Sequence, residues 1–140
     1  MERYTITGPG DAPQVILLLK DRTVIGHLAA YTRPVLVGRG KLTIGLIGGV
    51  AVATCHRLGH ARGLLAKAFA YFRSRSIAFS VLFALIRVYR SSGYRPMQNV
   101  TRFLDTDGAW KEYVYHGGMV AELDHHQWDD AFLDLMGPTV

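Results

Sequence analysis

The hydrophobic period of this chain changes at one point, and that change limits the folds open to it. From Lys41 to Val52 apolar residues alternate with small or polar ones, as in a strand with one buried face. Beyond residues 55–60, apolar residues recur every three or four positions, as on the buried face of a helix. These positions are Ala61, Leu64, Leu65, Ala68, Phe69 and Phe72. A strand that passes directly into a helix predicts an α/β (α+β) domain.

The remaining segments predict further strands around this helix. Extended stretches are expected at Val15–Lys20, at Val24–Val37, at Phe79–Ala84 and at Arg95–Leu104. A bend, a bulge or a sheet edge is expected at Arg33-Pro34. One last strand is expected over Lys111–Tyr115 and Met119–Leu123, broken at Gly117-Gly118. Gly48-Gly49 predicts a bulge, Asp105–Gly108 a hairpin turn, and Ile86–Ser92 a short helix that stops at Gly93. This order predicts a mixed sandwich with one right-handed strand–helix–strand crossover.

The composition is that of one globular domain over residues 1–140, with 49% apolar and 19% charged residues. Cys55 is the single cysteine, which excludes an internal disulfide framework and a four-cysteine zinc site. No stretch approaches the ~20 apolar residues that span a membrane, and no leader peptide is visible. A cytoplasmic protein without a membrane partner is therefore expected.

The net charge of +5 favours anionic partners, either a nucleic acid or a phosphorylated cofactor. The basic residues do not gather in one long stripe, and no nucleic-acid-binding motif occurs. We therefore expect no nucleic-acid partner.

The turn before the helix predicts an anion site. A helix N-terminus presents unpaired N–H donors and a partial positive charge. Gly59 allows close approach of the backbone, Ala61 is small, and Arg57 and Arg62 add positive charge. A phosphate group fits this pattern. The turn is neither the Gly-Lys-Ser/Thr nucleotide loop nor the three-glycine dinucleotide fingerprint.

Two blocks of the chain resemble the GCN5-related N-acetyltransferase (GNAT) superfamily. The spacing x-x-Gly59-x-Ala61, between Val50–Val52 and Leu64-Leu65, resembles its motif A. The block Leu82–Tyr94 is similar to the following strand and helix, with Tyr89 four residues before Gly93-Tyr94. The resemblance covers residues 14–123 and looks closest to the small-molecule branch that includes aminoglycoside 2'-N-acetyltransferases. It implies a mixed, mostly antiparallel sheet with a central splayed strand pair and flanking helices.

The resemblance also implies a reaction, the transfer of an acetyl group from acetyl-CoA to a small-molecule amine that attacks the thioester directly. Tyr89 would protonate the departing thiolate. The strand end would pair with the pantetheine amides, and the turn would hold the pyrophosphate of coenzyme A. The implied cofactor-binding residues are Val50, Ala51, Val52, His56, Arg57, Leu58, Gly59, His60, Ala61 and Arg62.

Three departures from the family pattern are visible. His56 stands where the family has Arg or Gln, and Gly48 stands where relatives often carry a glutamate base. About a dozen residues precede Val15, where the family has a strand and one or two helices that wall the acceptor site. The chain is therefore expected to lack most of that strand-helix-helix segment and to form a homo-oligomer, with a dimer as the expected state. The missing N-terminal helices and the absent glutamate favour the alternative of a non-catalytic acyl-CoA-binding or degenerate GNAT module that acts through a partner.

Several residues have two interpretations. His56 and His60 have the spacing of a helical zinc pair, but loop histidines near a phosphate are the preferred interpretation, and no metal is expected. His125-His126 with the neighbouring aspartates is read as a solvated turn. Cys55 is a nucleophile or a small buried apolar residue. Tyr89 is a proton donor or a core aromatic, and Trp128 and Phe132 either touch a substrate or pack the C-terminal tail.

Overall fold

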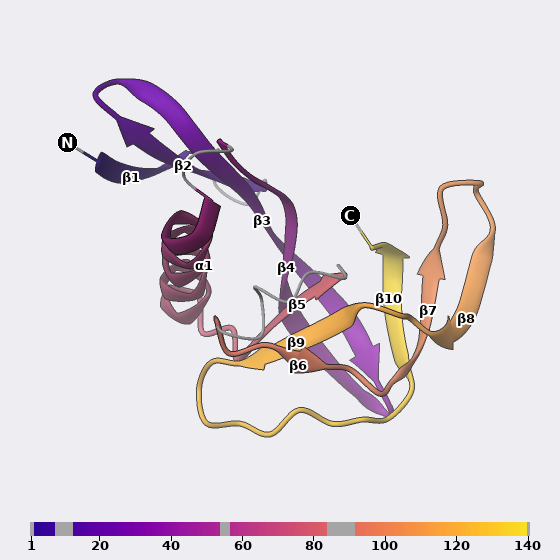
Figure 1. Cartoon of the computed structure of the whole chain (residues 1–140). Helices are drawn as coiled ribbons and strands as arrows, with labels where there is room; N and C mark the ends of the chain where they lie inside the picture. Colours follow the sequence, from indigo (N-terminus) through magenta and orange to yellow (C-terminus); the bar gives the residue numbers. More distant parts are fainter. Residues whose placement is uncertain (1, 8–12, 54–56, 84–91, 140) are drawn as a thin grey trace.

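The computed structural model describes residues 2–7, 13–53, 57–83 and 92–139. These residues form one helix, α1 (Arg57–Ser74), and a ten-stranded sheet. The strands are β1 (Glu2–Thr7), β2 (Gln14–Lys20), β3 (Thr23–Val37), β4 (Gly40–Val52), β5 (Phe79–Phe83), β6 (Arg95–Pro96), β7 (Val100–Leu104), β8 (Trp110–Val114), β9 (Gly118–Glu122) and β10 (Leu133–Pro138) (Figure 1).

The sheet is mixed and mostly antiparallel. Its main order is β6-β9-β5-β4-β3-β10-β7-β8, and β2 with β1 is added beside β3. The 15-residue strand β3 is long enough to pair with β2 along its first half and with β10 at its end. Among the described strands, β4–β5 and β7–β10 are the parallel pairs. The expected mixed α/β fold with a parallel strand–helix–strand unit is confirmed.

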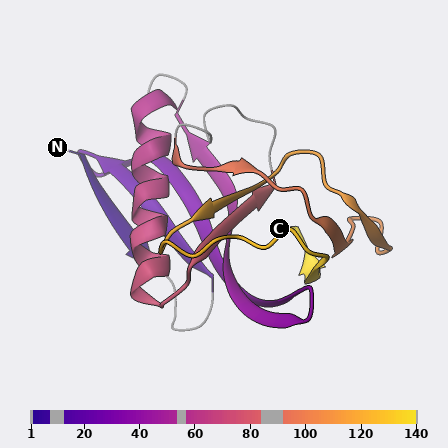
Figure 2. The same cartoon turned by 90° about the horizontal axis from the view of Figure 1, so that it is seen from below.

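Two cores lie on the two faces of the sheet. Helix α1 lies across one face (Figure 2), where its apolar side chains, including Leu64 and Phe72, form the helix-side core. The other face carries the far-side core, which includes Ile44 on β4, Phe79 on β5 and Trp128. Alternate residues of β4 and β5 contribute to the two cores because successive strand side chains point to opposite faces.

Strand β3 is not interrupted at Pro34, but among the described residues Pro34 lies at an open strand edge, one of the three arrangements predicted for it. Strand β3 runs through Pro34, which lies opposite Thr43 of β4. Between Ala30 and Leu36, β3 has a described strand neighbour only on its β4 side. A proline lacks a backbone donor, and an open strand edge tolerates that loss.

The predicted last strand, broken at Gly117-Gly118, is also wrong, because β8 and β9 have different neighbours. Strand β8 pairs with β7, whereas β9 pairs with β5 and β6. A turn separates them, in which Gly117 has φ of 94° and the Gly118 N–H donates to the Tyr115 carbonyl. The expected hairpin turn at Asp105–Gly108 joins β7 to β8 as predicted.

Strands β1 and β10 were not predicted. Strand β1 pairs with β2, and β10 is inserted between β3 and β7. Trp128 fixes the segment before β10, because its indole N–H donates to Asn99 Oδ1 at 2.8 Å. Asn99 in turn donates to the Asp129 and Ala131 carbonyls. Trp128 therefore packs the C-terminal tail. No helix in the described part of the chain is long and apolar enough to cross a membrane.

Candidate functional site

The central parallel strands β4 and β5 separate at one end. They are paired only where Gly45, Leu46 and Ile47 lie opposite Ser80, Val81 and Leu82. Beyond Ile47, β4 continues to Val52, and in the described part of the chain no strand pairs with it on the β5 side. We call this end of the two strands the splay. It is the splayed strand pair that the sequence resemblance implied.

A bulge in β4 begins the splay. Gly48 lies opposite Ala29 and Ala51 opposite His27, so β4 carries one residue more than β3 between these pairs. Gly49 has φ of 60°, a conformation that costs an L-residue about 1–2 kcal/mol. A β-carbon on Gly49 would meet no atom within 4 Å, so its backbone conformation, not packing, requires a glycine there. The bulge predicted at Gly48-Gly49 is confirmed.

The backbone of Val52 is directed into the splay. The Ala53 N–H donates to the Ile25 carbonyl at 2.7 Å, which makes these two residues a hydrogen-bonded pair. Hydrogen-bonded and non-bonded pairs alternate along an antiparallel ladder, so Val52, opposite Gly26, turns its N–H and C=O away from β3. The predicted strand segment from Val50 to Val52 thus offers main-chain hydrogen-bonding groups at the splay.

Helix α1 begins at Arg57, four residues before the expected first apolar position, Ala61. The predicted turn residues Arg57, Leu58, Gly59 and His60 therefore form the first helical turn instead of a preceding loop. Their N–H groups are the ones that an α-helix leaves without an internal partner. The first turn contains no acidic residue, which preserves the positive end of the helix dipole for an anion.

The helix is held close to the sheet and to β1 by two glycines. The ring of Phe72 occupies the space beside Gly45 on β4, where a β-carbon would lie 2.5 Å from it. On the other side of the helix, the Tyr4 hydroxyl fills the space of a side chain on Gly63. The ammonium group of Lys67 lies 5.7 Å from the centroid of the Tyr4 ring. Burial of Tyr4 raises the pKa of its hydroxyl, and the Glu2 carboxylate adds to that rise.

The side chains of two predicted site residues, His60 and Ala61, contact other parts of the protein. The Nε2 atom of His60 lies 2.6 Å from the Glu2 carboxylate on β1. Ala61 is buried in the helix-side core. Ala61 is the fifth residue of α1, so its N–H is used within the helix, and the imidazole of His60 is bound to β1. Arg62 is exposed beside them.

His56 and Tyr89 lie outside the described residues, as do the side chains of Arg57, Leu58 and Gly59. The short helix expected at Ile86–Ser92 lies almost wholly outside them too. After this segment, Gly93 has φ of 97° and Tyr94 is buried. The Tyr94 hydroxyl lies 2.7 Å from Ser80 Oγ on β5, and the Tyr94 ring packs against Phe69 in the helix-side core.

Two aromatic residues beside the splay were not found from the sequence. Phe83 follows Leu82, the last β5 residue paired with β4, and its ring lies 4.9 Å from that of Tyr115. Strand pairing of Phe83 with Gly118 brings them together. No local pattern links positions so far apart, so only the tertiary structure could reveal this contact.

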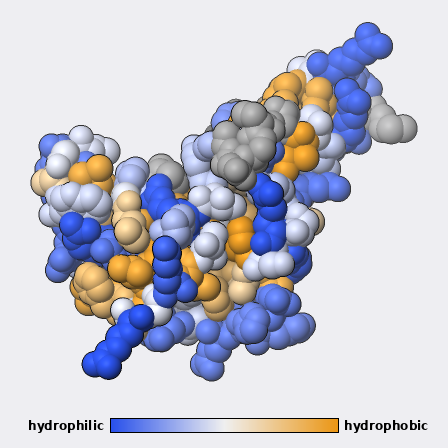
Figure 3. Space-filling view, turned by 180° about the vertical axis from the view of Figure 1, so that it is seen from behind, coloured by the Kyte–Doolittle hydropathy of each residue, from blue (hydrophilic) through white to orange (hydrophobic). Residues whose placement is uncertain are grey.

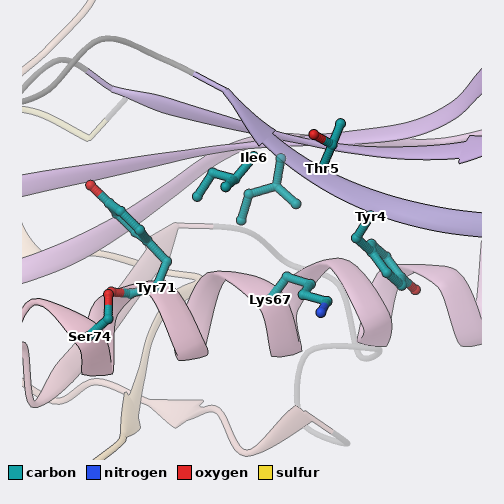
Figure 4. Close-up of a pocket in the computed structure, with 7 residues that line it drawn as sticks. Tyr4, Thr5, Ile6, Lys67, Tyr71 and Ser74 are labelled. Atoms are coloured by element: carbon teal, nitrogen blue, oxygen red, sulfur yellow. The ribbon is translucent and has the colours of Figure 1, made fainter.

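A pocket of about 320 Å³ lies between β1 and α1, away from the splay. Figure 4 shows Tyr4 and Ile6 of β1 facing Lys67 and Tyr71 of the helix across it. Lys67 is ten residues beyond Arg57, or about 15 Å along the helix axis. The pocket is therefore separate from the helix N-terminus.

No cluster of three or more potential metal ligands occurs among the described residues. His126 and Asp124 lie 3.8 Å apart and are both largely exposed, as in a solvated turn.

Comparison with known proteins identifies a family. The Acetyltransferase (GNAT) domain family matches residues 6–97. A GNAT family N-acetyltransferase (YhbS) from Escherichia coli, in complex with CoA, is 19% identical, with a TM-score of 0.66 over 87% of this chain and 66% of that chain. A GNAT family acetyltransferase from Brucella melitensis, in complex with acetyl-CoA, is 17% identical, with a TM-score of 0.58 over 86% and 64% of the two chains.

An acetyltransferase of the GNAT family from Staphylococcus aureus is 14% identical, with a TM-score of 0.56 over 81% of this chain and 70% of that chain. At such identities the likeness concerns the fold. The chain spans just under two thirds of the Escherichia coli and Brucella melitensis proteins. Comparison with the curated proteins gave no match.

Proposed function

The chain belongs to the GNAT acetyltransferase family, and from this premise we propose that it transfers an acetyl group from acetyl-CoA to a small-molecule amine. The observation that carries the proposal is the splay, where the Gly49 bulge opens β4 next to the start of α1. Main-chain groups and a helix N-terminus lie one after the other along the chain there. This is the order that a long ligand with amides and a phosphate end requires.

The residues present fit coenzyme A. Val52 turns its N–H and C=O into the splay, where they match the amide groups of pantetheine. The first-turn N–H groups from Arg57 to His60 match a pyrophosphate. A side chain at Gly59 would compete with that anion for the same space. When bound, acetyl-CoA supplies the thioester carbonyl that the amine attacks.

Tyr89 is the proposed proton donor to the leaving sulfur, on the basis of its spacing before Gly93 and Tyr94. Tyr94 is held by Ser80 on β5, the strand that borders the splay. The protein supplies no nucleophile in this reaction, because the amine attacks the acetyl carbon directly.

A second candidate function is a non-catalytic acyl-CoA-binding module that acts through a partner. Two observations favour it. Gly48 provides no carboxylate base on β4, and only residues 8–13 connect β1 with β2, where the family resemblance implies one or two helices. Such a module would bind acetyl-CoA without consuming it.

Isothermal titration separates binding from catalysis. Titration with acetyl-CoA and with desulfo-CoA should show saturable binding of both, because the phosphate and pantetheine contacts do not need the sulfur atom. An assay of free thiol with a panel of small amines should then show acetyl transfer. Binding without transfer to any amine would favour the module, and absence of binding would reject both functions.

A further inference from the structure

We propose that the acceptor is a neutral aromatic amine of the aniline type, bound along a row of aromatic rings that leads from the splay to β8. The aromatic row consists of Phe83, Phe103, Tyr113 and Tyr115. The inference rests on the proposed function, because it names the second substrate of that reaction.

The ring contacts of the row are continuous. Phe83, at the splay, lies 4.9 Å from Tyr115, and Tyr115 lies 5.1 Å from Phe103, measured between ring centroids. Phe103 lies 5.3 Å from Tyr113, and the two tyrosine rings are stacked at 6.2 Å with an angle of 17°. Edge-to-face and stacked contacts of this kind are the ones that favour a further aromatic ring.

The row lies on the face of the sheet that α1 does not cover. Phe83 and Tyr115 pack against the far-side core, and Phe103 belongs to it. Tyr113 is 47% exposed and Phe83 and Tyr115 are half-buried, so these three rings offer accessible surface, while Phe103 is buried and supports them from below. An acceptor on this face can reach the splay from the side opposite to the helix.

The strands and the helix around the splay carry no carboxylate of their own, and Glu2 of β1, which contacts the first turn of α1, is paired with His60. No Asp or Glu occurs between Arg22 and Leu104, a range that contains β4, α1, β5 and most of the Lys and Arg residues. Carboxylates elsewhere among the described residues that lie near the row are paired. Arg102 contacts Glu112 and Asp134, and Lys111 contacts Asp105 and Asp107.

This charge distribution selects against cationic amines. A polycation, such as an aminoglycoside, would meet a basic group of strands and helix that carries no carboxylate of its own for the ammonium groups. An alkylamine is protonated near neutral pH and must lose a proton before it can attack, which requires a base. An arylamine is neutral at that pH, because its nitrogen lone pair is delocalised into the ring, and it needs no such base.

The atoms of the transfer balance without a carboxylate. The amine nitrogen forms a bond to the acetyl carbonyl carbon, and the bond from that carbon to sulfur breaks with its electron pair on sulfur. The nitrogen releases one proton, and the thiolate takes up one proton. No oxidant or reductant takes part.

The experiment compares aniline with cyclohexylamine, which has a ring of similar size that is saturated and carries a protonated nitrogen. Spermidine represents the polycations. Release of free CoA from acetyl-CoA is measured at pH 7 with each amine, and binding of acetyl-CoA is measured separately by titration. We expect aniline to be acetylated with a kcat/KM at least tenfold above that of cyclohexylamine, and spermidine to give no reaction.

Variants of the row test the aromatic contacts. Tyr115→Leu and the exposed Tyr113→Leu should each lower kcat/KM for aniline roughly three- to tenfold, and Tyr115→Phe should retain it. Trp110→Leu is the matched control, because Trp110 is an exposed aromatic residue on the opposite face of β8. All variants should bind acetyl-CoA with wild-type affinity.

The outcomes separate this inference from the function on which it rests. Acetylation of cyclohexylamine or spermidine in preference to aniline would overturn the aromatic acceptor and leave the acetyltransferase standing. Equal losses in Tyr113→Leu and Trp110→Leu would overturn the aromatic row. A protein that binds no acetyl-CoA would overturn the proposed function and the inference together.

Discussion

The ring of Phe72 in α1 lies directly beside Gly45 of β4, so close that a β-carbon on this glycine would be 2.5 Å from the ring. This contact sets the distance between the helix and the sheet. Gly45 also belongs to the short stretch over which β4 pairs with β5. Helix position and strand pairing therefore depend on the same glycine.

We predict that Gly45→Ala destabilises the fold by about 1–3 kcal/mol, the usual cost of overpacking a core. Displacement of α1 should also move its first turn and weaken the binding of acetyl-CoA. Urea unfolding and titration measure the two effects. Gly40→Ala is the control on the same strand, where the added carbon would make only ordinary contact with the Val37 carbonyl. Wild-type stability of Gly45→Ala would show that the helix shifts freely.

Gly59 is expected to affect binding and stability in opposite directions. Alanine in a helix is favoured over glycine by roughly 0.5–1 kcal/mol, so Gly59→Ala should unfold at a higher temperature than the wild type. The added methyl group should nevertheless weaken coenzyme A binding, and Gly59→Val should abolish it. Acetyl-CoA at 100 times its dissociation constant should stabilise the wild type by about 2.7 kcal/mol. Normal binding by Gly59→Val would place the phosphate site elsewhere.

For Tyr89 we predict a role in the transition state. The phenol would meet the sulfur mainly as negative charge develops there, so Tyr89→Phe should lower kcat by roughly 10² to 10⁴ with little change in acetyl-CoA affinity. Single-turnover kinetics and titration measure these quantities. Full activity of Tyr89→Phe would identify Tyr89 as a core aromatic only.

Strand β8 is an unpaired edge of the sheet, and we predict that it mediates self-association of two copies. Trp110 and Val114 are about half exposed on one face of β8, as is Val100 on β7. Figure 3 shows exposed apolar residues interspersed with hydrophilic ones on one side of the molecule. Arg102 of β7 and Glu112 of β8 lie 3.9 Å apart on the same face, so their charges are paired within one copy and leave the apolar residues to make the contact.

Light scattering at micromolar concentration should therefore give the mass of a dimer. Val114→Lys should shift the mass to that of a monomer, because it places a charge in the apolar contact. Val24→Lys is the matched control, since Val24 is equally exposed at 50% but lies on β3. A monomeric wild type would refute the prediction.

The tip of the β7–β8 hairpin should be sensitive to acid. Hydrogen bonding by Lys111 is the main cause that lowers the pKa of Asp105, and the Ala109 N–H is the main cause for Asp107. A carboxyl whose folded pKa is lowered stabilises the fold above its unfolded pKa of about 3.9, and this contribution is lost as the pH falls through the lowered value.

The urea midpoint should thus decrease on acidification below about pH 4, and it should decrease less in Lys111→Met. Lys20→Met serves as the control, because Lys20 is an exposed lysine with no carboxylate contact among the described residues. An identical acid dependence in Lys111→Met and the wild type would show that the hairpin carboxylates do not contribute.

The sequence by itself determined the strand β4, its bulge and the helix α1 that follows it. The change of period located β4 and α1, because buried strand and helix faces impose different spacings on apolar residues. Gly49 predicted the bulge, because the left-handed backbone conformation at this position favours glycine. The sequence also predicted the helix start, because the spacing of apolar residues is a local pattern. The helix begins earlier than expected, at Arg57.

Only the tertiary structure decided which strands pair and which side chains meet. The separation of β8 from β9, the insertion of β10 beside β3, and the contacts of Glu2 with His60 and of Phe83 with Tyr115 all join positions distant in the chain. Strand pairing takes its stability from cross-strand and same-face neighbours, so a strand's own residues do not specify its partner. The aromatic row on the face opposite α1 forms only when these strands pair, because its rings come from β5, β7, β8 and the turn after β8.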